Sequence, residues 1–375
     1  MIDFDVVILT PTATTRTARV EEILRRLRED IVDPARALAL TFFTDATTED
    51  GLREDREEIR RLAAAALREK PVPVSVVSQA PAGAPAGAGG AGIALEAQVL
   101  VGEAMVERRT AGGRPYTVVT AGGSRQVHAG GLGADATGDT TARSRIAFDE
   151  MEAILAAEGL GYGHVVRQWN YIERFLDLGA NGRQPYQDFN DVRTERYDRD
   201  EFPAGYPAAT GIGQATGGVV IEFVAVDASP EIEVAPVTNP RQIDAHRYSE
   251  CVLVGDAPEK TPPKFERAKL VRNGGTETVF VSGTASIIGE QSVAVGDVAA
   301  QTVTTLENIG ILSDSRALVS LRAYVKRADD IATVRSVCEA SWPSCDALYV
   351  VADVCREELL VEIEGRARRR PGAET

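Results

Sequence analysis

The sequence is poor in the residues on which metal sites and extracellular folds depend. Its 375 residues include only four cysteines and three histidines. No two cysteines have the CxxC spacing of a structural zinc site, so neither zinc nor a disulfide framework is expected. No apolar run approaches the roughly 18 residues needed to cross a bilayer, and the acidic start at residues 1–5 is unlike a signal peptide. We therefore expect a soluble, cytoplasmic protein with free thiols and no membrane contact.

Positive charge is also scarce. The 56 acidic residues outnumber the 41 basic ones, which gives a formal net charge of -15. This balance argues against nucleic-acid binding, because a phosphate backbone demands a concentrated basic face. The single basic run, at residues 366–370, is interpreted as a solvated C-terminal tail. Hydrophobic residues make up 44% of the chain, so a large core is expected, and the length suggests two or three domains.

One order of elements occurs three times along the chain, which identifies an internal repeat. Periods of about 3.6 residues mark its helices and periods of 2 mark its strands. The C-terminal copy has helices at 297–312 and 331–340 and strands at 318–325, 347–351 and 359–365. The middle copy has helices at 140–158 and 188–197 and strands at 164–172 and 217–226. The N-terminal copy has helices at 20–30 and 53–70 and strands at 37–44, 72–78 and 93–100.

These repeats predict an α/β (α+β) fold of three similar units around a pseudo-threefold axis. Aligning the closing strands places Glu96, Glu222 and Glu362 at one equivalent position. The expected units are 1–105, with a mobile Ala/Gly/Pro-rich loop at 80–92; 106–272, with an irregular excursion at 227–272; and 273–375. We expect the last two units to form the active site.

Two tempting motifs are set aside. The glycine-rich segment 211–217 is followed by a strand rather than a helix, so it is not a nucleotide-binding fingerprint. It instead favours a close approach of the backbone to a site. The three histidines have no metal-ligand spacing and are interpreted as structural or solvated.

The unit order, with a closing strand that reads VEIEG, resembles the RidA (YjgF) superfamily, whose chorismate-mutase-like subunits form trimers with clefts between them. RidA imine deaminases use an arginine at a position that falls near Ala347, where this chain has no arginine. Imine deamination by the third unit is therefore not expected. A chain that supplies all three units itself is expected to be a monomer acting as a pseudo-trimer.

A more specific resemblance is to the chorismatase family, which is RidA-like in fold and splits chorismate. It covers roughly residues 115 to 365. The segments that carry it are Trp169-Asn170-Tyr171, Tyr186 with Asp188-Phe189 and Arg193, Pro207 to Gly213, Asn239-Pro240, Ala245-His246 with Tyr248, Pro262-Pro263 with Phe265 and Arg267-Ala268, Ser282 to Ala285, Gly296 to Val298, and Leu359 to Gly365. The first hundred or so residues depart from the family pattern, because they contain a fuller helical unit.

The resemblance implies cleavage of an enolpyruvyl ether by a general acid, without metal or organic cofactor. Such an acid must keep its proton near pH 7, so a partly desolvated carboxyl group is needed. Residues i and i+2 share a face of a strand, so the sequence pattern does not separate Glu362 from Glu364. Glu362 matches the catalytic acid of the family.

The resemblance also implies a set of substrate-binding residues. Arg193, Arg267 and Arg322 match basic positions that would hold the two substrate carboxylates, with surface ion pairing as the alternative for each. Tyr186 and Tyr248 are candidates for hydrogen bonding to the substrate, although a packing role is open for Tyr248.

Three further positions indicate the reaction subtype. Gln242, Gly283 and Cys355 match the branch that forms 3-hydroxybenzoate and pyruvate through an arene oxide, and Cys355 would assist catalysis; an inert buried thiol is the alternative. Other possibilities are a hydrolase that forms a dihydroxycyclohexadienoate, an enzyme that acts on a related acid, and a non-catalytic RidA-like protein that binds a small metabolite.

Overall fold

The structure of the chain, a computed structural model, describes residues 2–31, 33–67, 71–82, 92–179, 182–249 and 261–369. Most of the loop expected at 80–92 lies outside these residues, as does Cys251. Within the described part of the chain, no helix is long and apolar enough to span a membrane. Short 3-10 turns lie at Pro34–Arg36, Tyr162–His164, Ala245–Arg247 and Ala328–Asp330.

The first unit is a four-stranded sheet with two helices on one face. Its elements are β1 (Asp3–Leu9), α1 (Arg16–Ile31), β2 (Ala37–Thr44), α2 (Glu49–Leu67), β3 (Val74–Ser78) and β4 (Ile93–Val101). The strand order is β1-β4-β2-β3, and only β2 and β3 are parallel. Val20, Ile23 and Leu27 on α1 and Ile59 on α2 pack with the sheet in one apolar cluster, as their helical spacing predicts.

The second unit repeats this arrangement and adds two strands at one edge. Its elements are β5 (Met105–Ala111), β6 (Arg114–Ala121), β7 (Ser124–Leu132), α3 (Thr140–Ala157), β8 (Val165–Glu173), α4 (Pro185–Tyr197), β9 (Ala208–Gln214) and β10 (Val219–Asp227). The order β5-β6-β7-β10-β8-β9 contains the four-strand pattern of the first unit. Both helices begin and end within a few residues of the predicted bounds.

The third unit has the same six-stranded topology. Its elements are β11 (Ile232–Val237), β12 (Ala268–Asn273), β13 (Thr276–Ala285), α5 (Val298–Ser313), β16 (Ala317–Val325), α6 (Ile331–Ser341), β17 (Asp346–Val351) and β18 (Val361–Arg369), with a small hairpin of β14 (Ile287–Ile288) and β15 (Gln291–Ser292). The sheet order is β11-β12-β13-β18-β16-β17. The excursion expected at 227–272 therefore contributes two strands, β11 and β12, to the sheet of the third unit.

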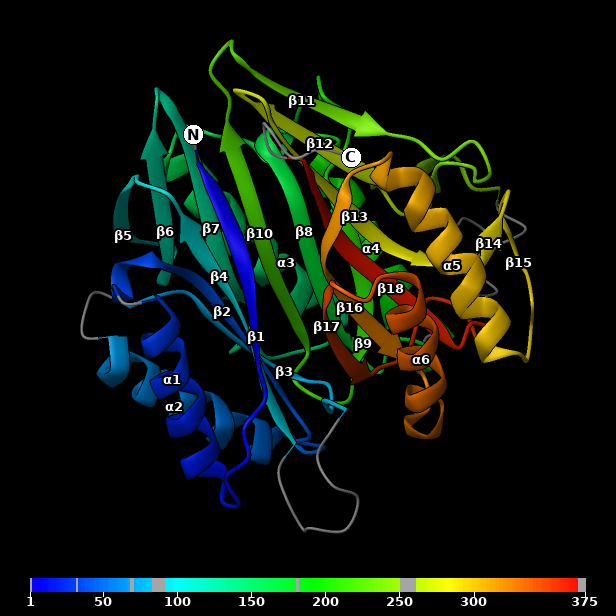
Figure 1. The fold of residues 1–375 in the computed structure, drawn as a ribbon, viewed down its shortest axis with the longest axis horizontal. Helices are drawn as coiled ribbons and strands as arrows, with labels where there is room; N and C mark the ends of the chain where they lie inside the picture. Colours follow the sequence, from blue (N-terminus) through cyan, green and yellow to red (C-terminus); the bar gives the residue numbers. More distant parts are fainter. Residues whose placement is uncertain are drawn as a thin grey trace.

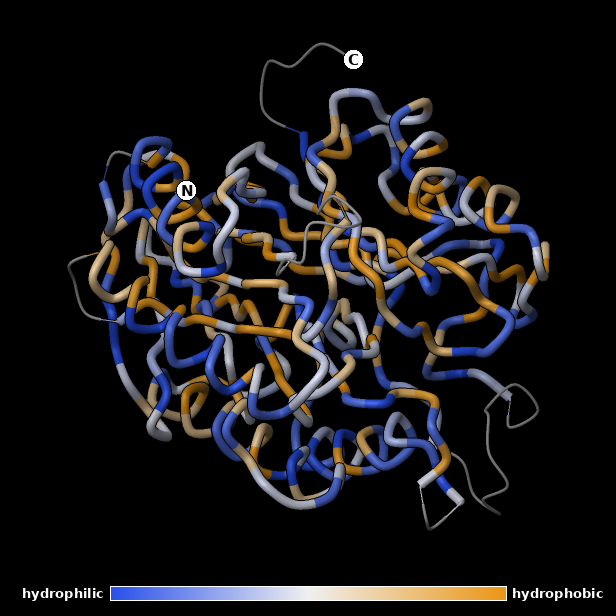
Figure 2. Tube along the Cα trace, turned by 90° about the horizontal axis from the view of Figure 1, so that it is seen from below, coloured by the Kyte–Doolittle hydropathy of each residue, from blue (hydrophilic) through white to orange (hydrophobic). Residues whose placement is uncertain are grey.

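The three sheets surround a common centre, and the helices lie outside them. Figure 1 shows α1 and α2 on one side of the strands, α5 and α6 on another, and α3 and α4 behind them. In Figure 2, hydrophobic stretches run mainly through the middle of the trace, whereas the peripheral helices alternate between hydrophobic and hydrophilic residues. This arrangement confirms the predicted α/β fold of three repeated units.

Strand register identifies the equivalent residues of the three units and corrects the predicted alignment. Glu96 lies opposite Thr41, Glu222 opposite Trp169, and Glu364 opposite Arg322. In each unit this glutamate is the fourth residue of the closing strand. The third equivalent glutamate is therefore Glu364. The expectation for Glu362 was wrong by two residues, because a shift of two keeps a side chain on the same face of its strand.

A ring of polar contacts joins each unit to the next. Thr41 Oγ1 of unit one donates to Glu222 of unit two at 2.8 Å. Trp169 Nε1 of unit two donates to Glu364 of unit three at 2.6 Å. Arg322 of unit three closes the ring through two hydrogen bonds to Glu96 of unit one, at 2.6 and 3.1 Å. The three glutamates therefore tie the units together around the pseudo-threefold axis.

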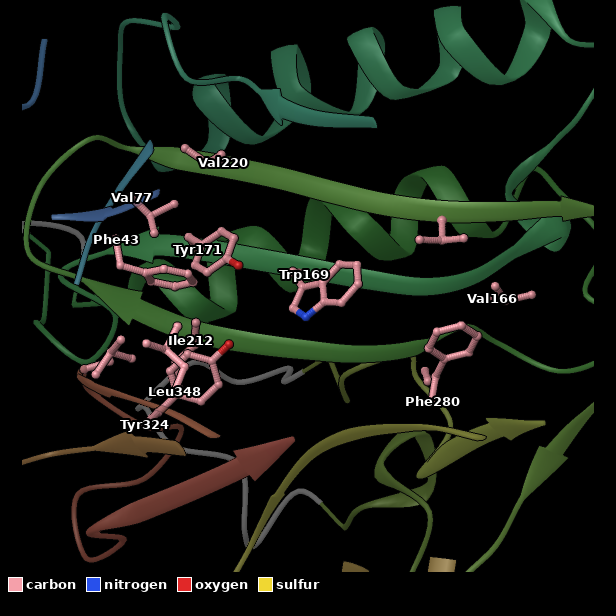
Figure 3. Packing of buried hydrophobic residues seen from close by; sticks show 14 of the residues in the cluster. Phe43, Val77, Val166, Trp169, Tyr171, Ile212, Val220, Phe280, Tyr324 and Leu348 are labelled. Atoms are coloured by element: carbon pink, nitrogen blue, oxygen red, sulfur yellow. The ribbon is translucent and has the colours of Figure 1, made fainter. Parts of the chain in front are cut away.

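Aromatic side chains from all three units pack beside this ring. Phe43, Tyr171 and Tyr324 each lie opposite the second residue of a closing strand and belong to one buried cluster. Figure 3 shows these three rings close together, with Trp169 beside them.

Two arginines of the basic run lie in the core rather than in a solvated tail. Arg366 and Arg368 lie in β18 and are only 4% and 6% exposed. Both donate to the carbonyl of Phe4 and to the carboxylate of Asp5 in β1. The prediction of a solvated tail was wrong for Arg366 and Arg368, because their acidic partner, Asp5, lies at the opposite end of the sequence.

Candidate active site

The cleft that contains Glu362 lies between the second and third units. Tyr186 at the start of α4 and Gly211 in β9 form its wall from unit two, while Arg267, Gly283 and Glu362 belong to the third unit. It encloses about 680 Å³, counting its open mouth. A concave, mainly apolar site with a few convergent polar groups is typical of a small-molecule pocket.

The Glu362 side chain projects from β18 into this cleft and is 4% exposed. Burial, followed by repulsion from Glu364, raises the pKa of Glu362 to about 8. Its carboxyl group also hydrogen-bonds with the Cys355 thiol. At neutral pH this side chain is therefore mainly a neutral carboxylic acid that can give up a proton.

Glu364 lies on the same face of β18 but has the opposite electrostatic environment. Arg167 Nη2 and Trp169 Nε1 donate to it at 2.6 Å each, and the Thr210 hydroxyl donates as well. Burial alone would raise the pKa of Glu364, but Arg167 and Arg322, together with these hydrogen bonds, lower it overall. The pKa values of the two carboxyl groups are thus driven apart, so that Glu362 is protonated and Glu364 is ionised.

The absence of a side chain at Gly283 leaves the space that the Glu362 carboxyl group occupies. A β-carbon at residue 283 would overlap Glu362 Oε1 and lie 3.2 Å from Thr210 Cγ2. The backbone N–H of Gly283 donates to Thr210 Oγ1 at 3.0 Å, so this strand segment is held against β9. Because Thr210 is held by this hydrogen bond, any side chain at 283 would displace the Glu362 carboxyl group.

The Cys355 thiol lines the same cleft in its protonated form. Burial, followed by the proximity of Glu362, raises the pKa of Cys355 to about 12. A thiol with so high a pKa is a poor nucleophile. Cys355 is therefore suited to donate a weak hydrogen bond within the cleft.

Arg267 and Tyr248 form the polar wall of the cleft. Arg267 is 3% exposed. It donates to the Tyr248 hydroxyl at 2.6 Å and to the carbonyl of Ile243. Its guanidinium group lies 5.3 Å from the Tyr248 ring centroid and 5.9 Å from that of Phe265. A cation fixed in this way can receive an anionic group of a ligand.

Arg193 lies behind the cleft surface rather than in it. It is 2% exposed and donates to Asn190, and its Nε has no partner among the described residues. Its charge acts on the neighbouring Tyr186, and Tyr186 is the residue that lines the cleft. Of these two predicted site residues, only the tyrosine faces the pocket.

Arg322 and Gln242 do not line the cleft. Arg322 belongs to the axial ring, where it binds Glu96 and donates to the hydroxyls of Tyr171 and Tyr324 at 2.7 and 3.0 Å. Its expected role as a ligand for a substrate carboxylate is incompatible with this position. Gln242 donates to the carbonyl of Ile287, a residue that does line the cleft, at 3.1 Å.

The backbone approach expected near Gly211 is present. A β-carbon there would lie 3.0 Å from Tyr186 Cε2, so the glycine allows the ring to pack over β9. Two residues that support the site, Arg167 and Thr210, were missed. Thr210 lies inside a segment that resembles the chorismatases, whereas nothing in the sequence pattern marks Arg167.

Among the three units, only the third has an acid at this position of its closing strand. Register places Ala94 opposite Phe43 and Val220 opposite Tyr171, just as Glu362 lies opposite Tyr324. The other two units thus have an aliphatic residue where the third has the acid. A chemistry that depends on this carboxyl group has one site per chain.

Comparisons with known proteins agree with this architecture. A crystal structure of a chorismatase matches with a TM-score of 0.66 over 98% of this chain and 99% of that chain, at 23% sequence identity. The two proteins therefore share the fold along their whole length.

Sequence comparisons assign the family. The N-terminal domain of FkbO/Hyg5-like chorismatases matches residues 105–225. The chain is 37% identical over 225 residues to a chorismatase of Streptomyces rapamycinicus, which covers 55% of this chain and 64% of that protein. It is 35% identical over 250 residues to a 3-hydroxybenzoate synthase of Streptomyces hygroscopicus, which covers 61% of this chain and 70% of that protein. The chain belongs to the chorismatase family.

Proposed function

We propose that this protein converts chorismate to 3-hydroxybenzoate and pyruvate. The observation that supports it best is the neutral carboxyl group of Glu362 in a cleft that also contains Arg267. The relatives in Streptomyces named as chorismatases and as a 3-hydroxybenzoate synthase support the choice of substrate.

In this proposal Glu362 acts as the general acid. It protonates the methylene carbon of the enolpyruvyl ether. The adjacent ether-bearing carbon becomes oxocarbenium-like, and the enolpyruvyl group of the substrate becomes a better leaving group. Arg267 holds one substrate carboxylate. Tyr186 hydrogen-bonds to the other substrate carboxylate, and Arg193 lies behind this tyrosine.

The subsequent steps define the product. The ring hydroxyl attacks the neighbouring carbon and displaces pyruvate, which gives an arene oxide. The arene oxide opens and loses a ring proton to aromatise, with the Cys355 thiol beside the ring. The two products together contain all the atoms of chorismate, so no water is consumed. The diol-forming route differs because it adds one water molecule.

Incubation of the purified protein with chorismate tests the proposal. A coupled assay measures pyruvate, and chromatography separates the aromatic acids from diols. We expect stoichiometric pyruvate and 3-hydroxybenzoate. A diol product would contradict the subtype, and the absence of pyruvate would favour a metabolite-binding role instead.

We further propose that one chain is the functional unit, a monomer acting as a pseudo-trimer. The ring of contacts between Thr41, Trp169 and Arg322 and the three glutamates closes within one chain. Light scattering coupled to size-exclusion chromatography should give the mass of a monomer, and a stable mass of two or more chains would contradict it.

A further inference from the structure

Glu364, like its counterparts in the other two units, joins neighbouring units together. We infer that it is also the positioning residue that keeps Glu362 in its acid form. The inference rests on the proposed role of Glu362. Glu96 and Glu222 occupy the equivalent axial position but have Ala94 and Val220 where unit three has the acid.

The carboxyl groups of Glu362 and Glu364 are held close to each other in unit three. Residues separated by one position on a strand lie about 6.6 Å apart and share a face. Arg167, Trp169 and Thr210 hold Glu364 in place, so it cannot rotate away from its neighbour. In a buried environment, a second negative charge at this separation is strongly unfavourable. Glu362 therefore keeps its proton while Glu364 is ionised.

Glu364 also engages the buried cation that most favours an ionised Glu362. The charged or titratable groups around Glu362 on other elements are Arg167 on β8, Tyr324 opposite it on β16, Arg267 before β12, Cys355 before β18 and Tyr186 on α4, with Tyr248 and Arg356 in the same cleft. Arg167 would favour an ionised Glu362, but its Nη2 is engaged by Glu364 at 2.6 Å. Loss of the Glu364 charge would remove a repulsion and expose an attraction, and both changes favour deprotonation of Glu362.

The pH dependence of pyruvate release distinguishes this role from a structural one. Because the acid works only when protonated, kcat/KM should fall as pH rises through the pKa of Glu362. In Glu364→Gln this alkaline fall should move to lower pH by about 1 unit or more. Glu364→Asp retains the charge and should restore most of the wild-type profile. Glu222→Gln, which loses the equivalent axial carboxyl group of the second unit, should leave the fall where it is.

A second variant should shift the alkaline fall in the opposite direction. Arg167→Gln removes the cation and leaves the Glu364 charge unshielded, so the alkaline fall should move to higher pH. It keeps the inference testable if Glu364→Gln does not fold, which thermal melting would reveal. An unchanged pH profile in folded Glu364→Gln, or an equal shift in Glu222→Gln, would overturn the inference.

An infrared titration separates this inference from the proposed function. The band of the protonated carboxyl group, assigned by its loss in Glu362→Gln, reports the protonation of Glu362 without any turnover. If the wild-type protein releases no pyruvate from chorismate, the proposed function fails. The inference would still stand if Glu364→Gln lowers the pH at which this band disappears, and would fail if the pH does not change.

Discussion

Replacement of Gly283 by alanine is the most direct test of how the acid is placed. The new β-carbon would overlap Glu362 Oε1 and approach Thr210 Cγ2 at 3.2 Å. Thr210 is fixed by hydrogen bonds with Arg167, Glu364 and the residue 283 backbone, so the Glu362 carboxyl group is the part that must move. We expect it to rotate away from the substrate position.

The expected loss can be bounded from both sides. A misplacement of about 1 Å costs roughly 10²-fold in rate, and complete loss of a general acid costs about 10²- to 10⁴-fold. Gly283→Ala should therefore lower kcat for pyruvate release by about 10²-fold, as measured by the coupled assay. In a Glu362→Gln background the same change should add little, because the acid is already gone.

A matched control is available in the third unit. Gly310 lies within α5, and a β-carbon there would meet no atom within 4 Å. Gly310→Ala should keep full activity and gain up to about 1 kcal/mol of stability from the higher helix propensity of alanine. If Gly283→Ala releases pyruvate within twofold of the wild-type rate, our account of how the carboxyl group is positioned is wrong.

Three further outcomes are expected. Glu362→Gln should reduce pyruvate release by about 10²- to 10⁴-fold while chorismate still binds in a calorimetric titration; near-normal turnover would remove the proposed mechanism. Cys355→Ala should retain most pyruvate release but shift the product from 3-hydroxybenzoate towards the diol, and unchanged products by chromatography would reject only the subtype. Arg322→Met should lower the free energy of unfolding by about 3–5 kcal/mol, because it leaves Glu96 buried without its cation; an unchanged denaturant midpoint would contradict the axial ring.

The elements of the fold could be predicted from the sequence because their signals are local. Helical and alternating apolar patterns located α3, α5, β8 and β16 within two residues. The excursion at 227–272 was harder, since β11 and β12 are joined by a long segment and pair only with each other and with β13.

The site was only partly predictable, because its electrostatics depend on contacts between distant residues. The sequence VEIEG offers two glutamates on one strand face, and only pairing with β16 shows which one is axial. Arg322 was assigned to the substrate because nothing near it in the sequence indicates Glu96, its partner 226 positions away. Arg267 and Gly283, which were chosen by resemblance to the chorismatases, line one cleft with Glu362.

The aliphatic residues at the positions equivalent to Glu362 bear on how such an enzyme can evolve. In an assembly of identical subunits, every substitution appears at all three interfaces, so a buried acid would be introduced three times. Here Ala94 and Val220 occupy this position at two interfaces, and only one interface carries the energetic cost of desolvating a second carboxyl group beside its axial glutamate. Fusion of the units allows each interface to accumulate substitutions independently, and a gain of activity at one does not compromise the cohesion of the other two.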